Sequence, residues 1–228
     1  MSAAVTEPAP ARLPARLDVA ALIRAASAED HRATENRGFI SRLMGGELDL
    51  AEYARYLAQF AHVYEALEAR ADDADADSVF DPRLRRLARI DSDLAALGAA
   101  DWRARWHMLP ATSDYVRHLR TLVGSTDPLD ARARYLAHHY ARYLGDLSGG
   151  QAIATLVTRH YGATSEQLSF YDFSELGSVV HAKRDYKERM NALELDGIEV
   201  EALTDEVLLA FRLNGAIFDE LATERRSA

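Results

Sequence analysis

Apolar residues recur at steps of three and four along most of the chain, the spacing that places them on one face of an α-helix. The clearest stripe falls within residues 49–71 and consists of Tyr53, Tyr56, Leu57, Phe60, Tyr64 and Leu67. A second stripe near the end of the chain consists of Val207, Phe211, Asn214, Phe218 and Leu221. No segment alternates apolar and polar residues as a half-buried strand would, and no Asn-Gly turn joins two such runs. The pattern predicts an all-α fold of roughly seven to nine helices.

Acidic residues mark several helix starts. Asp49 is followed three residues later by Glu52, the arrangement of a capping box. Asp81-Pro82 and Asp127-Pro128 each place an aspartate before a proline, and proline is well tolerated in the first turn of a helix. These three positions are therefore predicted to begin helices.

The chain divides into a tail and one domain. Residues 1–16 contain three prolines among alanines and lack the apolar core of a signal peptide, so they are expected to form a flexible tail. Residues 17–228 have the length of one ordinary domain. Within that domain, residues 71–82 form an acidic loop and residues 162–178 form a second irregular stretch.

Composition excludes several classes of function. With 48% apolar and 28% charged residues the chain is expected to be globular, and its net charge of −9 argues against nucleic-acid binding. No stretch approaches the roughly 20 apolar residues that span a bilayer, so the protein is expected to be cytoplasmic with no membrane partner. The absence of cysteine excludes disulfides, thiolate metal sites and a cysteine nucleophile.

A five-residue motif, LSGGQ at residues 147–151, is similar to the signature of ABC-type ATPases. Such a signature works beside a phosphate-binding loop of the form GxxxxGK[ST]. The chain contains no Gly-Lys pair and none of the strands of a nucleotide-binding fold. ATP hydrolysis is therefore not the function that this motif indicates.

The same glycines lie in a helical pattern. Gly145, Gly149 and Gly150 fall within six residues, and Gly145 and Gly149 share a helix face because they are four apart. Each glycine costs a helix about 0.5–1 kcal/mol relative to alanine, so the set needs a reason. A flat ligand lying against the bare backbone is one reason, and a kink or a tight helix crossing is another. Asp146, within the motif, could hold water beside such a ligand or be a solvated surface charge.

His31 is a candidate metal ligand on a predicted helix. Arg24 precedes it by seven residues, which is two helical turns and about 10 Å on nearly the same face. Glu35, one turn later, could orient the imidazole. An imidazole with a cation two turns away suits a planar metal complex with peripheral carboxylates, and haem is such a ligand. The alternative is an amphipathic helix with a histidine that has no special role.

A second set of cations occurs later in the chain. Lys183, Tyr186 and Lys187 share one helix face at steps of three and four. Two lysines at this spacing could clamp carboxylates, or they could form a solvated basic face.

Taken together, these segments resemble the haem oxygenase family. The resemblance rests on HHYARYLGDLSGGQ at residues 138–151, on His31 followed by TEN and Phe39, and on VYEALE at residues 63–68. It extends to YKERMNALEL at residues 186–195 and to Phe211, Asn214 and Phe218. It implies a soluble bacterial-type enzyme with an all-α fold, in which haem lies between a proximal and a distal helix.

The resemblance also implies roles for individual residues. His31 would be the axial iron ligand, and Gly145, Gly149 and Gly150 would line the distal helix. Asp146, Arg142, Tyr64 and Asn214 match a distal hydrogen-bond network. The propionate-facing positions are Arg24, Lys183, Tyr186 and Lys187, and further haem contacts fall on Glu35, Tyr140, Ser148 and Phe211. Lys187 stands where some relatives have arginine, so a point charge replaces a forked donor.

The reaction implied by the resemblance is the oxidative cleavage of haem to biliverdin, carbon monoxide and ferrous iron. Haem would be both substrate and cofactor, and O2 would be the co-substrate. Electrons would come from a separate donor such as ferredoxin, flavodoxin or an NAD(P)H-dependent reductase, and the protein would be a monomer or a weak dimer. The cations at the propionate positions favour the α isomer of biliverdin. A non-catalytic haem-storage protein of the same fold is the alternative, and a thiaminase-like enzyme is disfavoured because the chain has no cysteine.

Overall fold

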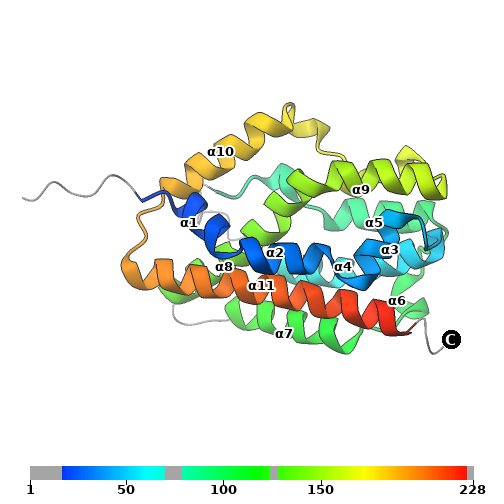
Figure 1. Cartoon of the computed structure of the whole chain (residues 1–228), viewed down its shortest axis with the longest axis horizontal. Coiled ribbons are helices and arrows are strands. Elements are labelled where there is room, and N and C mark those ends of the chain that lie inside the picture. Colours follow the sequence, from blue (N-terminus) through cyan, green and yellow to red (C-terminus); the bar gives the residue numbers. More distant parts are fainter. Residues whose placement is uncertain (1–16, 70–78, 124–127, 225–228) are drawn as a thin grey trace, which may run out of the picture.

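The computed structural model describes residues 17–69, 79–123 and 128–224, and the elements within these ranges are helical, which confirms the all-α prediction (Figure 1). Eleven α-helices lie in these ranges: α1 (Val19–Ala26), α2 (Ala28–Glu35), α3 (Gly38–Gly45), α4 (Leu50–Glu68), α5 (Leu87–Ala96), α6 (Trp102–Arg105), α7 (Pro110–Val123), α8 (Pro128–His139), α9 (Gly145–Tyr161), α10 (Val179–Asn191) and α11 (Gly197–Glu224). The predicted number was too low because the first part of the chain divides into three short helices. The predicted tail 1–16, residues 71–78 of the predicted acidic loop and Asp127 lie outside the described residues. No helix in the described ranges is long and apolar enough to cross a membrane.

Helix α4 carries the first apolar stripe into the core. Tyr53, Leu57, Phe60 and the other stripe residues are buried, and α4 packs against α5 and α7. The predicted capping box is present at its start, where Asp49 accepts a hydrogen bond from the Glu52 amide at 2.8 Å and Glu52 accepts one from the Asp49 amide at 3.0 Å. The long helix α11 closes the core by packing against α8, α7 and α2.

The segment that carries Arg24 and His31 is two helices rather than one. Ser27 separates α1 from α2, with φ −89° and ψ 1°. Its hydroxyl donates to the Ile23 carbonyl at 2.7 Å, a side-chain bond that competes with regular helix geometry. Arg24 lies in the last turn of α1 and His31 lies on α2, so the single helix predicted to carry both residues is wrong.

The glycine motif begins directly after a turn of π-helix. Residues Tyr140–Leu144 form this turn, η2, which joins α8 to α9. Figure 1 shows α8 and α9 running in different directions on either side of it. Single π turns inside helices occur frequently at functional sites, because the wider turn displaces the backbone that follows it. Here η2 ends immediately before Gly145, the first residue of α9.

The predicted irregular stretch at 162–178 consists of three single 3₁₀ turns: η3 (Ser165–Gln167), η4 (Ser169–Tyr171) and η5 (Ser174–Leu176). The Asp81-Pro82 pair also begins only a 3₁₀ turn, η1 (Pro82–Leu84), so the helix expected there is a single short turn and α5 follows at Leu87. In η1 the Asp81 side chain accepts a hydrogen bond from the Arg83 amide, as a cap does.

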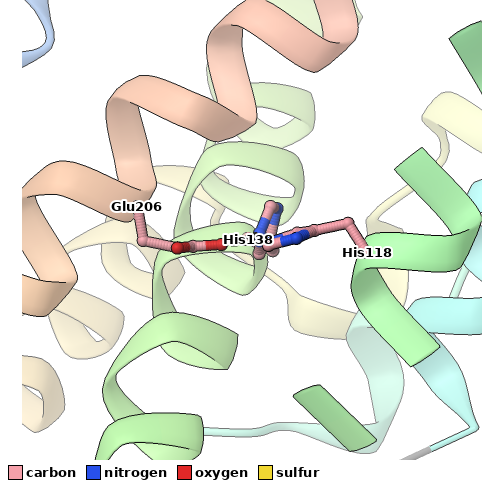
Figure 2. Close-up of side chains that lie close together, drawn as sticks. All are labelled: His118, His138 and Glu206. Carbon is pink, nitrogen blue, oxygen red and sulfur yellow. Dashed lines mark hydrogen bonds and ion pairs between the residues drawn. The ribbon is translucent and has the colours of Figure 1, made fainter. Parts of the chain in front are cut away.

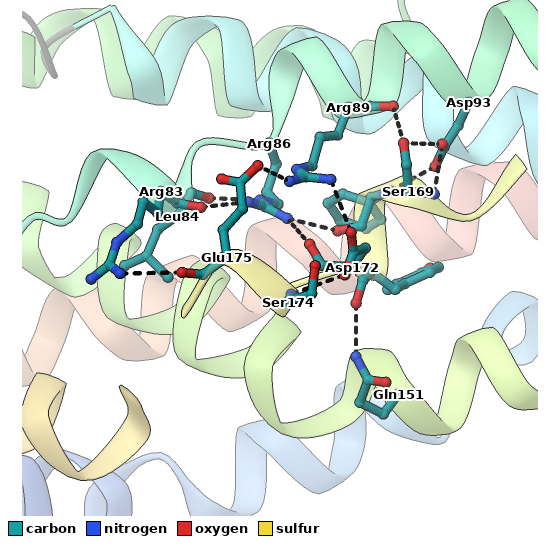
Figure 3. A network of polar contacts seen from close by, with 12 residues as sticks. Arg83, Leu84, Arg86, Arg89, Asp93, Gln151, Ser169, Asp172, Ser174 and Glu175 are labelled. Carbon is teal, nitrogen blue, oxygen red and sulfur yellow. Dashed lines mark hydrogen bonds and ion pairs between the residues drawn. The ribbon is translucent and has the colours of Figure 1, made fainter. Parts of the chain in front are cut away.

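Two buried charged residues hold this irregular stretch in place (Figure 3). The Arg86 guanidinium donates to the carbonyl of Asp172 at 2.9 Å and stacks on the ring of Phe173. Asp93 accepts hydrogen bonds from the amides of Ser169 at 2.7 Å and Phe170 at 2.9 Å. Buried polar groups cost free energy unless they are paired, so these contacts fix the position of η4, which packs against α9.

A buried histidine lies at the end of α8. His139 Nδ1 is 2.8 Å from the hydroxyl of Tyr186, and the two rings stack at 4°. Burial, together with the charge of Arg189, lowers the pKa of His139 to about 3. In the unfolded chain the pKa of this group has its ordinary value of about 6.5. The folded chain therefore holds a neutral ring under conditions in which the unfolded chain binds a proton.

We predict that His139→Phe reduces the loss of stability at acid pH. Below pH 6.5 the unfolded chain binds one proton more than the folded chain, so stability falls by about 1.4 kcal/mol per pH unit until the pH approaches 3. Between pH 7 and pH 5 the unchanged chain should therefore lose about 2 kcal/mol more than the variant. Denaturant unfolding at both pH values measures this difference, with His181→Phe as an exposed control. Equal losses in the chain and in His139→Phe would contradict the assignment.

Candidate functional site

Most of the predicted ligand-binding residues meet at one cavity. Its volume is 460 Å³, within the range of about 300–1,000 Å³ typical of small-molecule sites. Helices α1 and α2 form one wall, η2 and the first turn of α9 form another, and α10 and α11 supply the remainder. The lining residues are Arg24, Ser27, Ala28, His31 and Arg32 from the first wall, Tyr140, Ala141, Leu144, Gly145 and Ser148 from the second, and Lys183, Lys187 and Phe211.

His31 lies in the first wall with one of its nitrogens engaged. Its Nδ1 is 3.4 Å from a carboxylate oxygen of Glu35, one turn along α2, as the spacing predicts. Its ring packs edge-on against Phe211 of α11, with ring centroids 5.3 Å apart. A carboxylate at Nδ1 fixes the ring orientation and favours the tautomer whose Nε2 carries a free lone pair. His31 can therefore act as a metal ligand through Nε2.

The three glycines of the motif serve different purposes. A Cβ added to Gly145 would meet no atom within 4 Å, and this residue lines the cavity. Gly149 is also open, but it does not line the cavity. Gly150 is buried, and a Cβ there would lie 2.8 Å from Cδ1 of Tyr171 in η4. Gly145 leaves room for a ligand to approach its backbone, whereas tight packing against Tyr171 explains Gly150, so Gly150 does not face the cavity as the resemblance implied.

A buried hydrogen-bond network lies behind the second wall. Arg142 donates to Tyr64 at 3.0 Å, to Asp146 at 3.1 Å and to Asn214 at 2.9 Å. The Tyr64 hydroxyl donates to the other oxygen of Asp146. All four side chains are buried, and none of them lines the cavity. The four residues that sequence similarity grouped together therefore form one network, which is continuous with the cavity wall through Gly145.

Burial and pairing act in opposite directions on the pKa values of the charged groups in this network. It raises the pKa of Asp146, although Arg142 and the Tyr64 hydrogen bond act in the opposite direction. Burial also opposes the positive charge of Arg142, but the oxygens of Tyr64 and Asp146 outweigh it and raise the pKa of Arg142. Burial likewise raises the pKa of Tyr64 well above its ordinary value. Arg142 is therefore a fixed cation, and Tyr64 is a neutral hydroxyl that donates a hydrogen bond to Asp146.

Cations gather at the cavity from three helices. Arg24 from α1 and Lys183 and Lys187 from α10 line it, as the sequence reasoning requires for carboxylate binding. Arg32 lines it as well, although the sequence reasoning did not select this residue. These charges can receive the carboxylates of a ligand whose flat body lies between the two walls.

Tyr186 is not brought to the cavity. Sequence reasoning placed it on one face with Lys183 and Lys187, but the structure buries it, and its hydroxyl pairs with His139. Periodicity shows which residues share a helix face, but it does not show which part of that face points to the cavity and which part, here Tyr186, points to the core.

The sequence reasoning did not select several residues that line the cavity, although the helical spacing could have identified most of them. Ser27 and Ala28 lie one turn before His31, and Ala141 lies four residues before Gly145. Small residues one turn away from a candidate ligand or from a bare glycine share its helix face, so they extend the same flat surface. Leu144 and Arg32 adjoin the predicted residues directly and have no independent sequence signal.

Comparison with known proteins shows the family to which this chain belongs. The family model described as Heme oxygenase matches residues 17–220. Heme oxygenase 1 of Gallus gallus is 32% identical over 90% of this chain and 70% of its own length, and that of the cyanobacterium Nostoc is 28% identical over 87% and 84%. The crystal structure of heme oxygenase-1 from Synechocystis in complex with heme superposes with a TM-score of 0.82 at 26% identity, covering 92% of this chain and 96% of that one. The heme oxygenase of Leptospira interrogans gives a TM-score of 0.79 at 30% identity, covering 90% and 100%. The chain belongs to the haem oxygenase family.

The two explanations for the glycines predict opposite effects on stability. Gly145 has helical dihedrals of φ −61° and ψ −50°, so Gly145→Ala should stabilise the fold by about 0.4–1 kcal/mol while weakening haem binding roughly tenfold by filling the cavity wall. Gly150→Ala should destabilise the fold by about 1–3 kcal/mol because Tyr171 must move. Denaturant unfolding and haem titration of both variants test this contrast. Unchanged haem affinity in Gly145→Ala would show that ligand approach does not explain this glycine.

Proposed function

We propose that this chain is a haem oxygenase that cleaves haem to biliverdin, carbon monoxide and ferrous iron, with O2 as co-substrate. The observation that carries the proposal is the cavity itself, which His31, Gly145 and four cations line together. Membership of the haem oxygenase family supports the same reaction. The storage alternative is not favoured, because the matching relatives are named as oxygenases.

The residues around the cavity suit haem. His31 would hold the iron through Nε2, because Nδ1 is engaged by Glu35. Gly145 offers bare backbone to the macrocycle, and Arg24, Lys183 and Lys187 offer positive charge to its two propionates. When bound, haem supplies both the iron centre that activates O2 and the ring that is opened.

Asp146 is proposed to organise water for proton delivery. Each of its oxygens accepts one hydrogen bond, from Arg142 or from Tyr64, and a carboxylate oxygen has capacity for a second. Water bound at the remaining positions would pass protons toward the cavity at its edge beside Gly145. Arg142 favours the charged form of this carboxylate against the effect of burial, and Tyr64 fixes its orientation.

The electron donor is proposed to be a separate protein, such as ferredoxin, flavodoxin or an NAD(P)H-dependent reductase. The chain contains no flavin- or nicotinamide-binding motif that would supply electrons internally. The same proposal includes a cytoplasmic location and a monomer or weak dimer.

A turnover assay tests the proposed function. Purified protein is mixed with haemin, a ferredoxin and its reductase, NADPH and O2, and the Soret band and the bilin bands are followed. The proposal requires loss of the Soret band with formation of biliverdin. A stable haem complex that yields no bilin would support storage instead.

We predict that His31→Ala binds haem more weakly and loses turnover. Loss of a neighbour of a metal ligand costs about 10–100-fold, so loss of the ligand itself should lower turnover about 100-fold or more. His31 is half-exposed, so the fold should change in stability by less than about 0.5 kcal/mol. The ferric absorption spectrum should change, and added imidazole should restore part of the turnover. An unchanged spectrum with full turnover would reject His31 as the ligand.

We predict that Asp146→Ala separates haem binding from catalysis. Asp146→Ala removes one partner of the buried Arg142 cation, so the fold should lose about 3–5 kcal/mol of stability. Tyr64 and Asn214 still pair with Arg142, and the Asp146 side chain does not line the cavity, so the dissociation constant of haem should remain within about threefold of that of the unchanged chain. Bilin formation should fall about 100-fold, the usual scale of a lost proton-transfer group. Asp146→Asn is the matched variant, because it keeps the shape but not the charge that pairs with Arg142. Normal biliverdin yield in both variants would remove Asp146 from the mechanism.

We predict that this chain forms mainly the α isomer of biliverdin. Cations at the propionates set the rotation of haem in its own plane, and exposed ion pairs contribute only about 0.2–1 kcal/mol each. Replacing Lys183 and Lys187 together by Gln should therefore yield mixed isomers while ligation by His31 persists. Arg184→Gln, an exposed cation on the same helix outside the cavity, is the control. Chromatography of the bilin decides the outcome, and a product of the unchanged chain dominated by β or δ isomers would contradict the assignment of the propionate cations.

A further inference from the structure

A second group of potential metal ligands lies away from the haem cavity. His118 of α7, His138 of α8 and Glu206 of α11 converge from three helices (Figure 2). Their ligand atoms all lie within 4.8 Å of one another, and none of the three residues lines the haem cavity. We refer to these three residues as the His118 cluster.

The two imidazoles of the His118 cluster are directed at the same atom. The Nε2 atoms of His118 and His138 both contact Oε1 of Glu206, and the distance from His138 is 2.8 Å. His138 and Glu206 are fully buried, with exposed side-chain fractions of 0% and 1%. Three potential ligand atoms therefore lie close together, two of them on fully buried side chains.

Neighbouring side chains hold the other polar atoms of the cluster. The Tyr115 hydroxyl lies 3.0 Å from His138 Nδ1, and Arg134 donates to Glu206 Oε2 at 2.8 Å. Protein metal sites use such second contacts to orient their ligands. Here they leave His138 Nε2 and Glu206 Oε1 directed toward the centre of the cluster.

We propose that the His118 cluster binds a divalent zinc ion. Two imidazoles and one carboxylate are a known zinc ligand set, with metal–ligand distances of about 2.0–2.2 Å. Tetrahedral geometry at those distances requires ligand atoms roughly 3.3 Å apart. The His138 nitrogen and the Glu206 oxygen, now 2.8 Å apart, would separate by about 0.5 Å, and all three ligand atoms already lie within 4.8 Å of one another. Zinc binding requires the lone pair of each Nε2, so each neutral imidazole would carry its proton on Nδ1, and at His138 the Tyr115 oxygen can accept a hydrogen bond from it.

An ion can reach the cluster from solvent. The His118 side chain is 27% exposed, and it lines a surface groove of 340 Å³ with Asp114 and Thr121. Water from this groove would complete the fourth coordination position. The bound ion would connect α7, α8 and α11, so its expected effect is to stabilise the fold. The proposal does not depend on the proposed reaction.

Zinc titration of the haem-free full chain without an affinity tag tests the site. The unchanged chain and the control His181→Asn should each bind one equivalent of Zn²⁺. The dissociation constant of Zn²⁺ for His118→Asn should be at least about tenfold higher. At 100 times the dissociation constant, Tm should rise by about 5–10 °C in the first two proteins. Each Tm shift is referred to the metal-free Tm of the same variant, so a change in folding caused by the substitution itself is not mistaken for lost binding.

Anomalous diffraction at the zinc edge locates the ion independently of any variant. A peak within about 2.2 Å of both Nε2 atoms and Glu206 Oε1 supports the proposal. Equal zinc affinity in the chain and in His118→Asn, or a peak only at other histidines, overturns it.

Discussion

The guanidinium of Arg142 is a buried cation, and the wall of the haem cavity depends on how it is paired. Removing one partner of a buried ion pair typically costs about 3–5 kcal/mol, so the acceptors around Arg142 are strongly fixed. Those acceptors are Tyr64 on α4, Asp146 on α9 and Asn214 on α11. One charge therefore holds three helices in register, and Arg142 itself belongs to the π turn that precedes Gly145. The same pairing favours the charged form of Asp146 against the effect of burial, directly behind the surface that the macrocycle would occupy.

The two walls of the cavity are built by different means. The second wall is anchored in the core through the Arg142 network and through Gly150 against Tyr171, so its backbone is rigid where a flat ligand must approach closely. The first wall is more exposed: no residue of α2 is buried, and His31 is positioned by Glu35 and Phe211. A rigid wall suits control of proton delivery, and a lightly held wall suits the entry and release of a large ligand.

Helical periodicity predicted the features that depend on local spacing. It placed Glu35 beside His31, put Lys183 and Lys187 on one face, and located the capping box of Asp49. The grouping of Asp146 with Tyr64, Arg142 and Asn214 came from family resemblance, because residues distant in sequence share no local pattern. The break at Ser27, the π turn and the burial of Tyr186 could not be predicted, since each depends on side-chain competition or on packing between distant helices. The reason for Gly150 likewise lies in η4, at Tyr171, which is 21 residues further along the chain.

The most direct test of this account is a crystal structure of the chain with haem bound. It should show the iron bonded to His31 Nε2, the ring against the backbone of Gly145, and the propionates near Arg24, Lys183 and Lys187. It should also show the contacts of Arg142 with Asp146 and Tyr64 described above. Iron bonded to a different residue, or a haem seated away from Gly145 with the Arg142 network disrupted, would contradict the account.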